Sequence, residues 1–316
     1  MESTQEKLIS VITITYNSQD EIVQCVDAVI NSGDPRLEMI VIDNVSTDGT
    51  IALLQEKYAH TKNVRLVFND ENIGFARGCN QGARLTNGKY ILLLNPDTVA
   101  SGHDILKLAE YLDHHPGVGI VGPKIIDEQG ITQESYGMDL TPWNEIVGKL
   151  FYSRYLEIIP GVKKWKDGRL LKDAEMEVGW IGGACTLIRR ELYERVNGID
   201  EAYFLSHADM IDLGKSISKL GYKIVLYPDI QIVHAGSKSI VNNRDMVLER
   251  AYRGTLYFFK KYYGFWTTLL IKIIYIILSC IKASVALPIA LFKKDPYYDI
   301  ARAHFKNAIR IIIGKL

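Results

Sequence analysis

Polar side chains follow four short apolar runs of this 316-residue chain, at the points where the runs end. The polar groups are Thr15-Tyr16-Asn17, Asp43-Asn44, Asn95-Pro96-Asp97 and His234. Carboxylates and an imidazole that share one cleft destabilise one another unless a cation or a sugar hydroxyl satisfies them. A carboxylate and a histidine with open coordination positions suit a divalent ion that also holds phosphate oxygens. The pattern predicts a polar site, provided that the fold gathers these four ends.

Asp97 has a second interpretation, because Asp and Asn cap helices and turns in many proteins. It precedes a helix expected over residues 102–112, and capping that helix is its alternative role. Asp48 is assigned to capping, since Asp48-Gly49-Thr50 introduces another helix. Pro96 ends the strand before Asp97 under both interpretations.

The elements that must position these groups are alternating strands and helices. Apolar runs rich in β-branched residues, typical of strands covered on both faces, lie at 8–16, 37–43, 64–68 and 89–95. Segments with helical periodicity lie between them, at 21–31, 50–59 and 75–85. This alternation predicts an α/β fold with a mostly parallel central sheet. Ligands of such sheets bind beyond the carboxyl ends of the strands, which is where the polar groups stand.

The second half of the chain is less regular. Residues 123–177 fit regular elements poorly, and we expect an insertion there that faces the acceptor. Order returns at 180–190, followed by a helix expected over 210–220 and strands over 223–227 and 230–234. The last of these strands would deliver His234 to the sheet.

Gly74, Gly78 and Gly82 recur at steps of four and give one predicted helix a bare face, along which a ligand or a backbone can come close. This is not the GxGxxG fingerprint of dinucleotide-binding proteins, which directly follows a strand. The first strand here runs into Tyr16-Asn17 without a glycine. The sequence therefore argues against a dehydrogenase.

The four cysteines lie far apart and form no CxxC pair. We therefore expect neither a disulfide framework nor a zinc site, and a reducing, cytosolic setting fits. The polar amino terminus, MESTQEK, shows no secretory signal.

The zero net charge hides an asymmetry along the chain. Residues 250–316 contain twelve Lys and Arg and two Asp and Glu, a net charge of +10, so residues 1–249 carry 25 minus 35, a net charge of −10. Such a basic tail calls for an anionic partner, which is either nucleic acid or membrane phospholipid.

The tail contains a strongly apolar segment at 265–282. Its polar residues recur at steps of three and four, as Thr268, Lys272, Tyr275, Ser279 and Lys282, and leave a broad apolar helix face. A spanning helix needs about 20 apolar residues. The two lysines disfavour spanning, so we expect a helix that lies in an anionic membrane surface.

The last twenty residues, 297–316, repeat this pattern with Arg302, Lys306 and Arg310. The alternative for both helices is packing on the core or in a homo-oligomer. We do not expect nucleic-acid binding, because the basic residues alternate with long aliphatic runs rather than with exposed aromatic residues.

Six ordered motifs resemble those of the family 2 glycosyltransferases of GT-A fold, and most of all the bacterial rhamnosyltransferases of cell-surface polysaccharide assembly. They are VITITYNSQDEI, VIDNVSTDGT, NENIGFARGCNQG, LLLNPDT, GGACTLIRR and the run from Asp200 to VHAGSKS, which together cover about residues 8–240. The resemblance implies a GT-A catalytic domain at 1–245, with a nucleotide-sugar half at about 1–122 and an acceptor half at about 123–245. Residues 246–316 then form a basic amphipathic region that associates with the membrane.

The resemblance assigns roles by position. It implies that Asp43 hydrogen-bonds the nucleotide base or ribose, and that the base is bordered by Thr15, Tyr16 and Asn17. The sugar-nucleotide pocket is lined by Asn72, Gly74, Arg77, Asn80 and Asn95. The segment Asn95-Pro96-Asp97 resembles a reduced DxD metal-binding signature, in which Asp97 meets Mg²⁺ or Mn²⁺ on the diphosphate and His234 completes the metal shell.

The catalytic base is less clearly marked by the resemblance. Family members show a Glu-Asp pair after an aromatic stretch, where this chain reads FLSHADMIDLGKS. Two alignments of this segment with the family are possible. One counts back from Gly221 and places the Glu-Asp pair at Asp209 and Met210, and the other matches the Val-Asp of the rhamnosyltransferases to Ala208-Asp209. Asp209 is an aligned carboxylate in both. Asp209 is the expected general base and Asp212 the reserve, unless Asp212 is a solvated residue of the following helix. No covalent nucleophile is needed, so we expect a single displacement with inversion.

The resemblance thus implies an inverting, metal-dependent glycosyltransferase at the cytoplasmic face of the cell membrane. Its expected donor is a nucleotide sugar, and the resemblance to bacterial rhamnosyltransferases suggests dTDP-rhamnose. Its expected acceptor is a lipid-linked glycan or a polysaccharide. The alternative is a non-catalytic sugar-nucleotide-binding or scaffold subunit, suggested by Ala208 and Met210 in place of polar residues.

Overall fold

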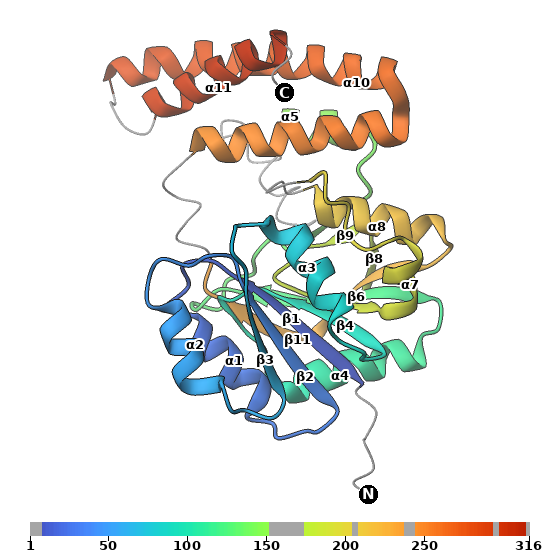
Figure 1. Cartoon of the computed structure of the whole chain (residues 1–316). Coiled ribbons are helices and arrows are strands. Elements are labelled where there is room, and N and C mark those ends of the chain that lie inside the picture. The colour runs from blue at the N-terminus through green and yellow to red at the C-terminus, as the bar shows by residue number, and fades with distance from the viewer. Residues whose placement is uncertain (1–7, 152–173, 204–207, 237–243, 293–296, 314–316) are drawn as a thin grey trace, which may run out of the picture. The chain divides into compact units, whose positions relative to one another are not determined.

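A computed structural model describes residues 8–151, 174–203, 208–236, 244–292 and 297–313. The chain forms two compact units (Figure 1). The first unit comprises Met1–Asp139, Leu170–Leu205 and Asp209–Gly236, and the second comprises Leu140–Arg169, Ser206–Ala208 and Ser237–Leu316. The second unit therefore takes in more of the chain than the tail from residue 246 that the sequence suggests.

The first unit is built on one mostly parallel nine-stranded sheet, which confirms the predicted α/β class. Its strands lie in the order β3 (Val64–Phe68), β2 (Leu37–Asp43), β1 (Ile9–Thr15), β4 (Tyr90–Leu94), β10 (Cys185–Arg189), β6 (Val118–Ile126), β11 (Lys223–His234) and β5 (Thr98–Val99). Strand β8 (Met176–Val178) pairs with β11. Strand β10 runs antiparallel to both β4 and β6, so β4, β6 and β11 all point the same way.

Helices cover both faces of this sheet. One core lies under α1 (Ile22–Ile30), α2 (Thr50–Tyr58) and α4 (Gly102–His114). The other lies under α3 (Gly74–Arg84), α7 (Arg190–Arg195) and α8 (Asp209–Lys219). Successive residues of β4 alternate between the two cores, because strand side chains point to opposite faces. This explains why the strands read as continuous apolar runs.

The predicted elements of the first 95 residues agree with the structure to within one residue at each end. Further along, the two strands predicted at 223–227 and 230–234 are one strand, β11, with an irregularity between Tyr227 and Gln231. Strand β6 escapes prediction because Gly119 and Gly122 interrupt its apolar pattern. A Cβ atom at Gly122 would come within 2.4 Å of the Ile181 side chain, so close packing requires glycine there.

The segment 123–177 is more regular than the sequence suggests. It holds the end of β6, the short strand β7 (Tyr136–Gly137), helix α5 (Pro142–Phe151) and the start of β8. Strand β7 pairs with β9 (Trp180–Ile181) in a separate two-stranded sheet. The part at 152–173 lies outside the described residues.

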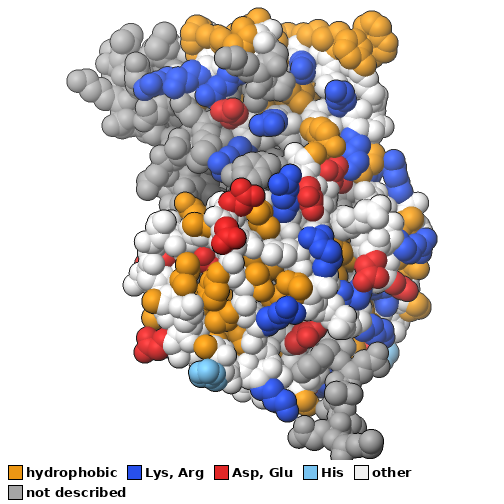
Figure 2. All heavy atoms as spheres, viewed as in Figure 1, with side chains coloured by type: hydrophobic (Ala, Val, Ile, Leu, Met, Phe, Trp, Pro, Cys, Tyr) orange, Lys and Arg blue, Asp and Glu red, His pale blue; other side chains and the backbone are white. Residues whose placement is uncertain are grey.

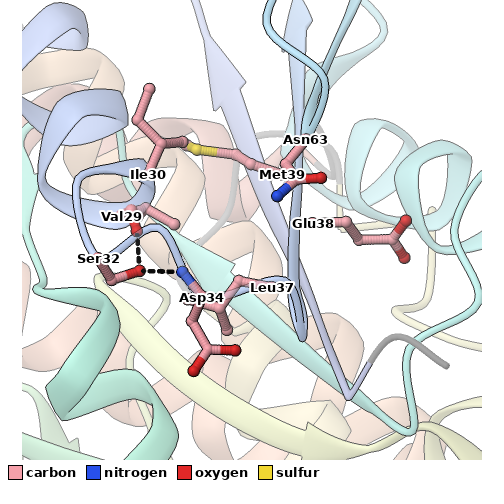
Figure 3. Close-up of a pocket in the computed structure, with 8 residues that line it drawn as sticks. All are labelled: Val29, Ile30, Ser32, Asp34, Leu37, Glu38, Met39 and Asn63. Carbon is pink, nitrogen blue, oxygen red and sulfur yellow. Dashed lines mark hydrogen bonds between the residues drawn. The ribbon is translucent and has the colours of Figure 1, made fainter. Parts of the chain in front are cut away.

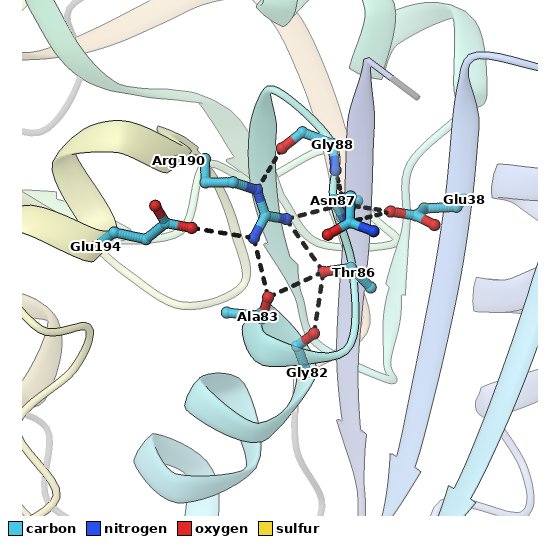
Figure 4. A network of polar contacts seen from close by, with 9 residues as sticks. Glu38, Gly82, Ala83, Thr86, Asn87, Gly88, Arg190 and Glu194 are labelled. Carbon is cyan, nitrogen blue, oxygen red and sulfur yellow. Dashed lines mark hydrogen bonds and ion pairs between the residues drawn. The ribbon is translucent and has the colours of Figure 1, made fainter. Parts of the chain in front are cut away.

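Arg190 fastens the end of the sheet opposite the polar strand tips (Figure 4). Its guanidinium donates hydrogen bonds to the carbonyls of Gly88 and Ala83 and to the hydroxyls of Thr86 and Ser10. These partners join α3, β1 and the turn before β4. A single cation thereby satisfies several buried acceptors, which stiffens the sheet away from the predicted site.

The second unit is helical. It contains α5, α10 (Arg244–Phe292) and α11 (Tyr297–Ile312), packed around Tyr252, Leu256, Phe259, Ile271, Tyr275 and Ile311. Gly264, at φ 78°, breaks α10 into two parts. The stretch Glu249–Ser284 is long and apolar enough to cross a bilayer by length and composition alone.

The polar stripe predicted at 265–282 turns toward the interior of this helical unit. Thr268, Tyr275 and Ser279 are all buried. The apolar side chains on the same stretch are exposed instead, Trp266 by 78% and Ile277 by 52%. The arrangement is the reverse of a helix whose polar side faces water.

Candidate active site

The polar strand tips of the first unit lie at one edge of the sheet. Thr15 and Asp43 are register partners at the ends of β1 and β2. Asn95 and Asp97 follow β4, which is parallel to β1, and His234 ends β11, which runs in the same direction. The topology therefore gathers the tips as the sequence pattern requires.

Asp97 and His234 lie against each other at this edge. His234 Nε2 is 3.2 Å from Asp97 Oδ1, and both side chains are largely buried. The backbone holds them in place, since Ala235 N–H donates to the Asp97 carbonyl and His234 pairs with Thr98 across β11 and β5. The structure brings together the two residues that the resemblance assigns to the metal.

The alternative role of Asp97 as a helix cap finds no support in the geometry. Helix α4 begins after Ser101, whose side chain accepts the Asp104 N–H at 3.1 Å. The cap position is therefore already filled by serine, and the Asp97 carboxylate is turned to His234 instead.

Gln133 orients the ring of His234 and was not predicted. Its side-chain N–H donates to the His234 carbonyl at 2.8 Å, which turns its oxygen toward His234 Nδ1 at 2.7 Å. An amide oxygen only accepts, so Nδ1 carries a proton and Nε2 is the ring nitrogen that faces Asp97. Gln133 lies 101 residues before His234, and no sequence spacing signals this contact.

The pair has the features of an incomplete cation site. Within the described part of the chain, His234 Nε2 is buried and has no hydrogen-bond partner. It faces a carboxylate oxygen 3.2 Å away, a contact that is an ion pair only when the ring is protonated. A divalent cation would satisfy both atoms, and the residues present therefore fit one.

The loops after β1 and β2 are joined by hydrogen bonds around Ser46. The buried Asp43 carboxylate accepts from both the N–H and the hydroxyl of Ser46. Asn17, at φ 52°, donates its N–H to Ser46 Oγ and accepts the Thr47 N–H with its side chain. Ser46 is a site residue that sequence reasoning missed.

Thr15 and Tyr16 contrast in exposure beside these joined loops. Thr15 is buried, and its hydroxyl has no hydrogen-bond partner among the described residues. Tyr16 is 53% exposed. The aromatic ring is thus available at the surface, while the two loops around it are held rigid.

The start of α3 carries three of the predicted pocket residues. Gly74, at φ 79°, donates its N–H to the Asn72 side chain at 3.0 Å, a backbone conformation that glycine adopts without strain. Arg77 lies 3.3 Å from Glu201 in an exposed ion pair. The bare face formed by Gly78 and Gly82 packs on β1, because a Cβ atom there would meet Ile14 or Ile12 at 2.8 or 2.6 Å.

Asn80 points into the protein rather than toward a pocket. Its side-chain nitrogen donates to the Ile199 carbonyl and to Glu201, and its oxygen accepts from the Tyr193 hydroxyl and the Ile199 N–H. All four hydrogen-bonding positions of the amide are used. Asn80 therefore ties α3 to the segment at 199–201 and has no capacity left for a ligand.

Asp209 is the first residue of α8 and is only 7% exposed. Burial raises its pKa to about 7, and the nearby Asp212 charge adds to this effect. The Met210 N–H donates to Asp209 Oδ1 at 2.7 Å and fixes the carboxylate. A carboxylate that titrates near neutrality is suited to general-base catalysis.

Asp212 is not the solvated residue that one interpretation of the sequence allows. It is 3% exposed and accepts a hydrogen bond from the Tyr203 hydroxyl at 3.1 Å. Met210, taken as a departure from the family pattern, belongs to the core under α8. Its apolar character therefore has a packing reason.

A small cavity at the start of β2 lies away from these residues (Figure 3). It is lined by Val29, Ile30, Ser32, Asp34, Leu37, Glu38, Met39 and Asn63. Its volume of about 20 Å³ admits a water molecule and no nucleotide. It stands at the opposite end of the strand from Asp43 and takes no part in the site.

Known proteins resemble this chain in sequence and in fold. The family model for glycosyl transferase family 2 matches residues 10–196, more than half of the chain. A Mycobacterium tuberculosis protein, N-acetylglucosaminyl-diphospho-decaprenol L-rhamnosyltransferase, is 25% identical over 275 residues, which are 82% of this chain and 86% of that protein.

Two solved structures show the same fold at low sequence identity. The mannosyltransferase PcManGT from Pyrobaculum calidifontis, in complex with GDP-Man and Mn²⁺, has a TM-score of 0.53 and 19% identity, covering 98% of this chain and 87% of its own. GalNAc-T7 with UDP, GalNAc and Mn²⁺ has a TM-score of 0.57 and 15% identity, covering 80% of this chain and 48% of its own. By its family model and its fold, this chain belongs to glycosyl transferase family 2.

Proposed function

We propose that this protein transfers a sugar from a nucleotide-sugar donor to an acceptor hydroxyl in one displacement, with inversion and with a divalent ion. The observation that carries the proposal is the Asp97–His234 pair, whose Nε2 and Oδ1 atoms face each other 3.2 Å apart at the sheet edge. A bound Mg²⁺ or Mn²⁺ would neutralise charge on the diphosphate as it leaves.

The protein supplies few ligands of its own to such an ion. Among the described residues no group of three or more His, Cys, Asp and Glu side chains gathers, so Asp97 and His234 are the ligands we assign. Diphosphate oxygens and water complete the shell in sites of this kind. Metal binding and donor binding should therefore depend on each other.

The nucleotide is assigned to the joined loops after β1 and β2. Asp43 and Thr15 lie at their base, and the Thr15 hydroxyl has no hydrogen-bond partner within the part of the chain that the structure describes. The exposed Tyr16 ring can stack on the nucleotide base. Asn72, Gly74, Arg77 and Asn95 are assigned to the sugar-nucleotide pocket beside them.

Asp209 is the proposed general base. Its carboxylate accepts the proton of the acceptor hydroxyl as the acceptor oxygen bonds to the anomeric carbon and the bond from that carbon to the diphosphate breaks. The raised pKa of Asp209, about 7 through burial, makes it a stronger base than an exposed aspartate. Asp212, hydrogen-bonded to Tyr203, remains the reserve.

The M. tuberculosis relative supports a proposal for donor and acceptor, because its name is N-acetylglucosaminyl-diphospho-decaprenol L-rhamnosyltransferase. We propose dTDP-rhamnose as donor and a polyprenyl-diphosphate-linked sugar as acceptor. A screen of nucleotide sugars should show release of nucleoside diphosphate only with Mg²⁺ or Mn²⁺ and with acceptor present. Binding of nucleotide without turnover under any metal would instead favour a non-catalytic subunit.

Gln133 gives a prediction about metal affinity. Gln133→Leu removes the hydrogen bond that holds His234 in place, so the affinity for Mn²⁺ with nucleoside diphosphate should fall about 10–100-fold. Isothermal titration calorimetry measures this directly. Gln129→Leu, in a nearby exposed turn, is the control and should leave the affinity unchanged. Equal affinities for Gln133→Leu and wild type would contradict the assignment of His234.

We also propose that the second unit holds the enzyme on the cytoplasmic face of an anionic membrane. Exposed apolar side chains gather on α10 and α11, and Figure 2 shows them at the top of the view with Lys and Arg nearby. They are Phe265, Trp266, Leu269, Leu270, Ile273, Ile277, Ile281, Phe305, Ile309, Ile312 and Ile313. A face of this size beside a net charge of +10 is complementary to anionic phospholipid.

Ile277 tests this membrane assignment. Ile277→Asp places a charge on the exposed face, where a buried aliphatic side chain contributes about 1.5–3 kcal/mol to insertion, so binding to phosphatidylglycerol vesicles should weaken by at least tenfold. Vesicle flotation of the full chain is the measurement. Ile131→Asp, 65% exposed in the first unit, is the matched control. Equal flotation of all three proteins would refute the assignment.

A further inference from the structure

Val45, in the loop after β2, has an unusual backbone conformation. Its φ is 65°, in the left-handed region where a Cβ atom comes too close to the backbone. Apart from glycines, the described residues with positive φ are Asn17, Val45 and Asn197. Asparagine is common in this region, whereas a β-branched residue is an outlier there. Of these three residues, Val45 is therefore the one that is held against a clear steric preference.

Hydrogen bonds on both sides of Val45 keep it in this conformation. Before it, the Asn44 N–H donates to the Thr15 carbonyl at 2.9 Å. After it, the Ser46 N–H donates to Asp43 Oδ1 at 2.8 Å. A strained residue persists only where its surroundings determine its conformation, and such residues cluster at ligand-binding and catalytic sites. Strain of this kind is expected where the side chain has a function.

The turn after β2 exposes Val45 and hides its polar neighbours. Asp43 has 0% of its surface exposed, and both oxygens of its carboxylate accept hydrogen bonds from Ser46. Asn44 and Ser46 are buried as well, whereas Val45 is partly exposed. A nucleotide that reaches this turn therefore meets the valine side chain before the Asp43 carboxylate.

Val45 lies beside Tyr16 in the two joined loops. The cross-loop hydrogen bond at Thr15 lies on one side of this pair, and on the other side the Asn17 N–H donates to Ser46 Oγ at 2.8 Å. Residues 16 and 45 therefore occupy the same position between two cross-loop hydrogen bonds. Tyr16 is 53% exposed, so one place offers an aromatic ring and an aliphatic side chain. Both are complementary to the flat, apolar face of a nucleobase.

We propose that Val45 packs against the nucleobase of the donor, beside the Tyr16 ring. This inference rests on the proposed function, which assigns the nucleotide to these loops. The contact depends on the base and is independent of the diphosphate and of the metal ion. Because the hydrogen-bonded turn holds Val45 in place beforehand, nucleotide binding does not have to order it. Asp43 is then a positioning residue, since its carboxylate holds Ser46 and thereby the turn that presents Val45.

Isothermal titration calorimetry of the full-length protein with Mn²⁺ tests the contact. The ligands are dTDP, UDP and GDP, together with inorganic diphosphate, which has no base. Val45→Gly and Val45→Ala should each weaken binding of the nucleotides that the wild type binds by about tenfold, because both remove the branched apolar side chain. Binding of inorganic diphosphate should equal that of the wild type. Asn197→Gly, at φ 62° and at the end of α7, is the matched control and should leave every affinity unchanged.

Thermal unfolding without ligand supplies a second measurement with a distinctive sign. Val45→Gly should raise the melting temperature by a few degrees, because glycine adopts a positive φ without strain. Val45→Ala should raise it less, since alanine keeps a Cβ atom, and Asn197→Gly should barely change it. Higher stability together with weaker nucleotide binding is expected of a strained binding residue. A purely structural valine would lose stability in both variants.

Three results would overturn the proposal. The first is nucleotide affinity that is equal in the wild type and in both Val45 variants. The second is an equal loss of nucleotide and inorganic diphosphate binding, which would show that the whole site has loosened. The third is a Val45→Gly variant that melts below the wild type. Wild-type protein that binds no nucleotide at all would refute the proposed function and this inference with it, whereas wild-type binding that both Val45 variants retain in full would refute the role of Val45 alone.

Discussion

Asp209→Asn should lower kcat by about 10²–10⁴-fold, because it removes the proposed proton acceptor. Asparagine keeps the side-chain oxygen that accepts the Met210 N–H, so the local structure should survive. Asp212→Asn, in the same helix and also buried, is the control and should retain kcat within about tenfold. Steady-state release of nucleoside diphosphate at saturating donor and acceptor measures both variants.

The pH dependence gives this prediction a second readout. The pKa of Asp209 is raised to about 7 by burial, so kcat/KM should fall about tenfold per pH unit below that value as the base is protonated. The residual activity of Asp209→Asn should not show this decline below about pH 7. If the decline in activity below about pH 7 persists in Asp209→Asn, or if only Asp212→Asn shows a large loss in kcat, the general base is Asp212 instead.

The same raised pKa has an opposite consequence for stability. Asp209 titrates near 3.9 in an unfolded chain and near 7 in the folded protein. Its contribution to stability is therefore fully present below about pH 3.9 and is lost as the pH rises through about 7. At pH 8 Asp209→Asn should be more stable than the wild type, by on the order of 3 kcal/mol. A variant that is inactive and yet more stable is the signature of a catalytic group held at a cost.

Asp97→Ala should abolish the proposed metal-dependent transfer, with a loss in kcat/KM on the order of 10³-fold or more, because Asp97 would hold the ion that offsets the charge of the diphosphate leaving group. The variant should also lose Mn²⁺ binding in the presence of nucleoside diphosphate. Asp127→Ala removes a carboxylate that only accepts the N–H groups of an exposed turn, and is the control. Transfer assays with and without Mn²⁺ measure the effect.

An Asp97→Ala variant with wild-type activity at every metal concentration would contradict the metal assignment. So would an equal loss in Asp127→Ala, since the Asp127 carboxylate is hydrogen-bonded to the N–H groups of the turn at 127–131. Partial rescue of Asp97→Ala by high Mn²⁺ would agree with the assignment, because His234 and the diphosphate still supply ligands.

Much of the fold could be predicted because burial on both faces leaves a strong signal in sequence. Strands β2 and β3 lie within the bounds that their apolar runs predict, and α1 to α3 follow the helical periodicity. The placement of Asp97 and His234 followed from topology alone, since parallel strands bring their carboxyl ends to one edge. Local pattern and sheet geometry were sufficient for these features.

The features that escaped prediction depend on contacts between distant residues. Gln133 reaches His234 across 101 residues, and Ser46 reaches Asn17 across 29. Strand β6 is hidden by Gly122, which Ile181 requires, and by Gly119, where a Cβ atom would meet Ile217 and Leu192. Asn80 matches a family motif by position, yet its side-chain amide forms hydrogen bonds with Tyr193, Ile199 and Glu201. No periodicity in the chain reports such pairings.

The direction of the polar stripe in α10 is a similar case. Helical periodicity correctly places Thr268, Tyr275 and Ser279 on one side of the helix. It does not show whether water or protein covers that side. Burial in the helical unit shows that protein covers it, which leaves the apolar side exposed and creates the surface assigned to the membrane.

The most direct measurement of the central claim is the ligand environment of bound Mn²⁺. Electron spin echo envelope modulation of the protein with Mn²⁺ and a nucleoside diphosphate should show one directly bound imidazole nitrogen and coupling to phosphorus. In His234→Ala the nitrogen signal should vanish and the phosphorus coupling should remain. Mn²⁺ that binds with nucleoside diphosphate yet shows no nitrogen coupling, or keeps that coupling in His234→Ala, would contradict the assignment of the ion to Asp97 and His234.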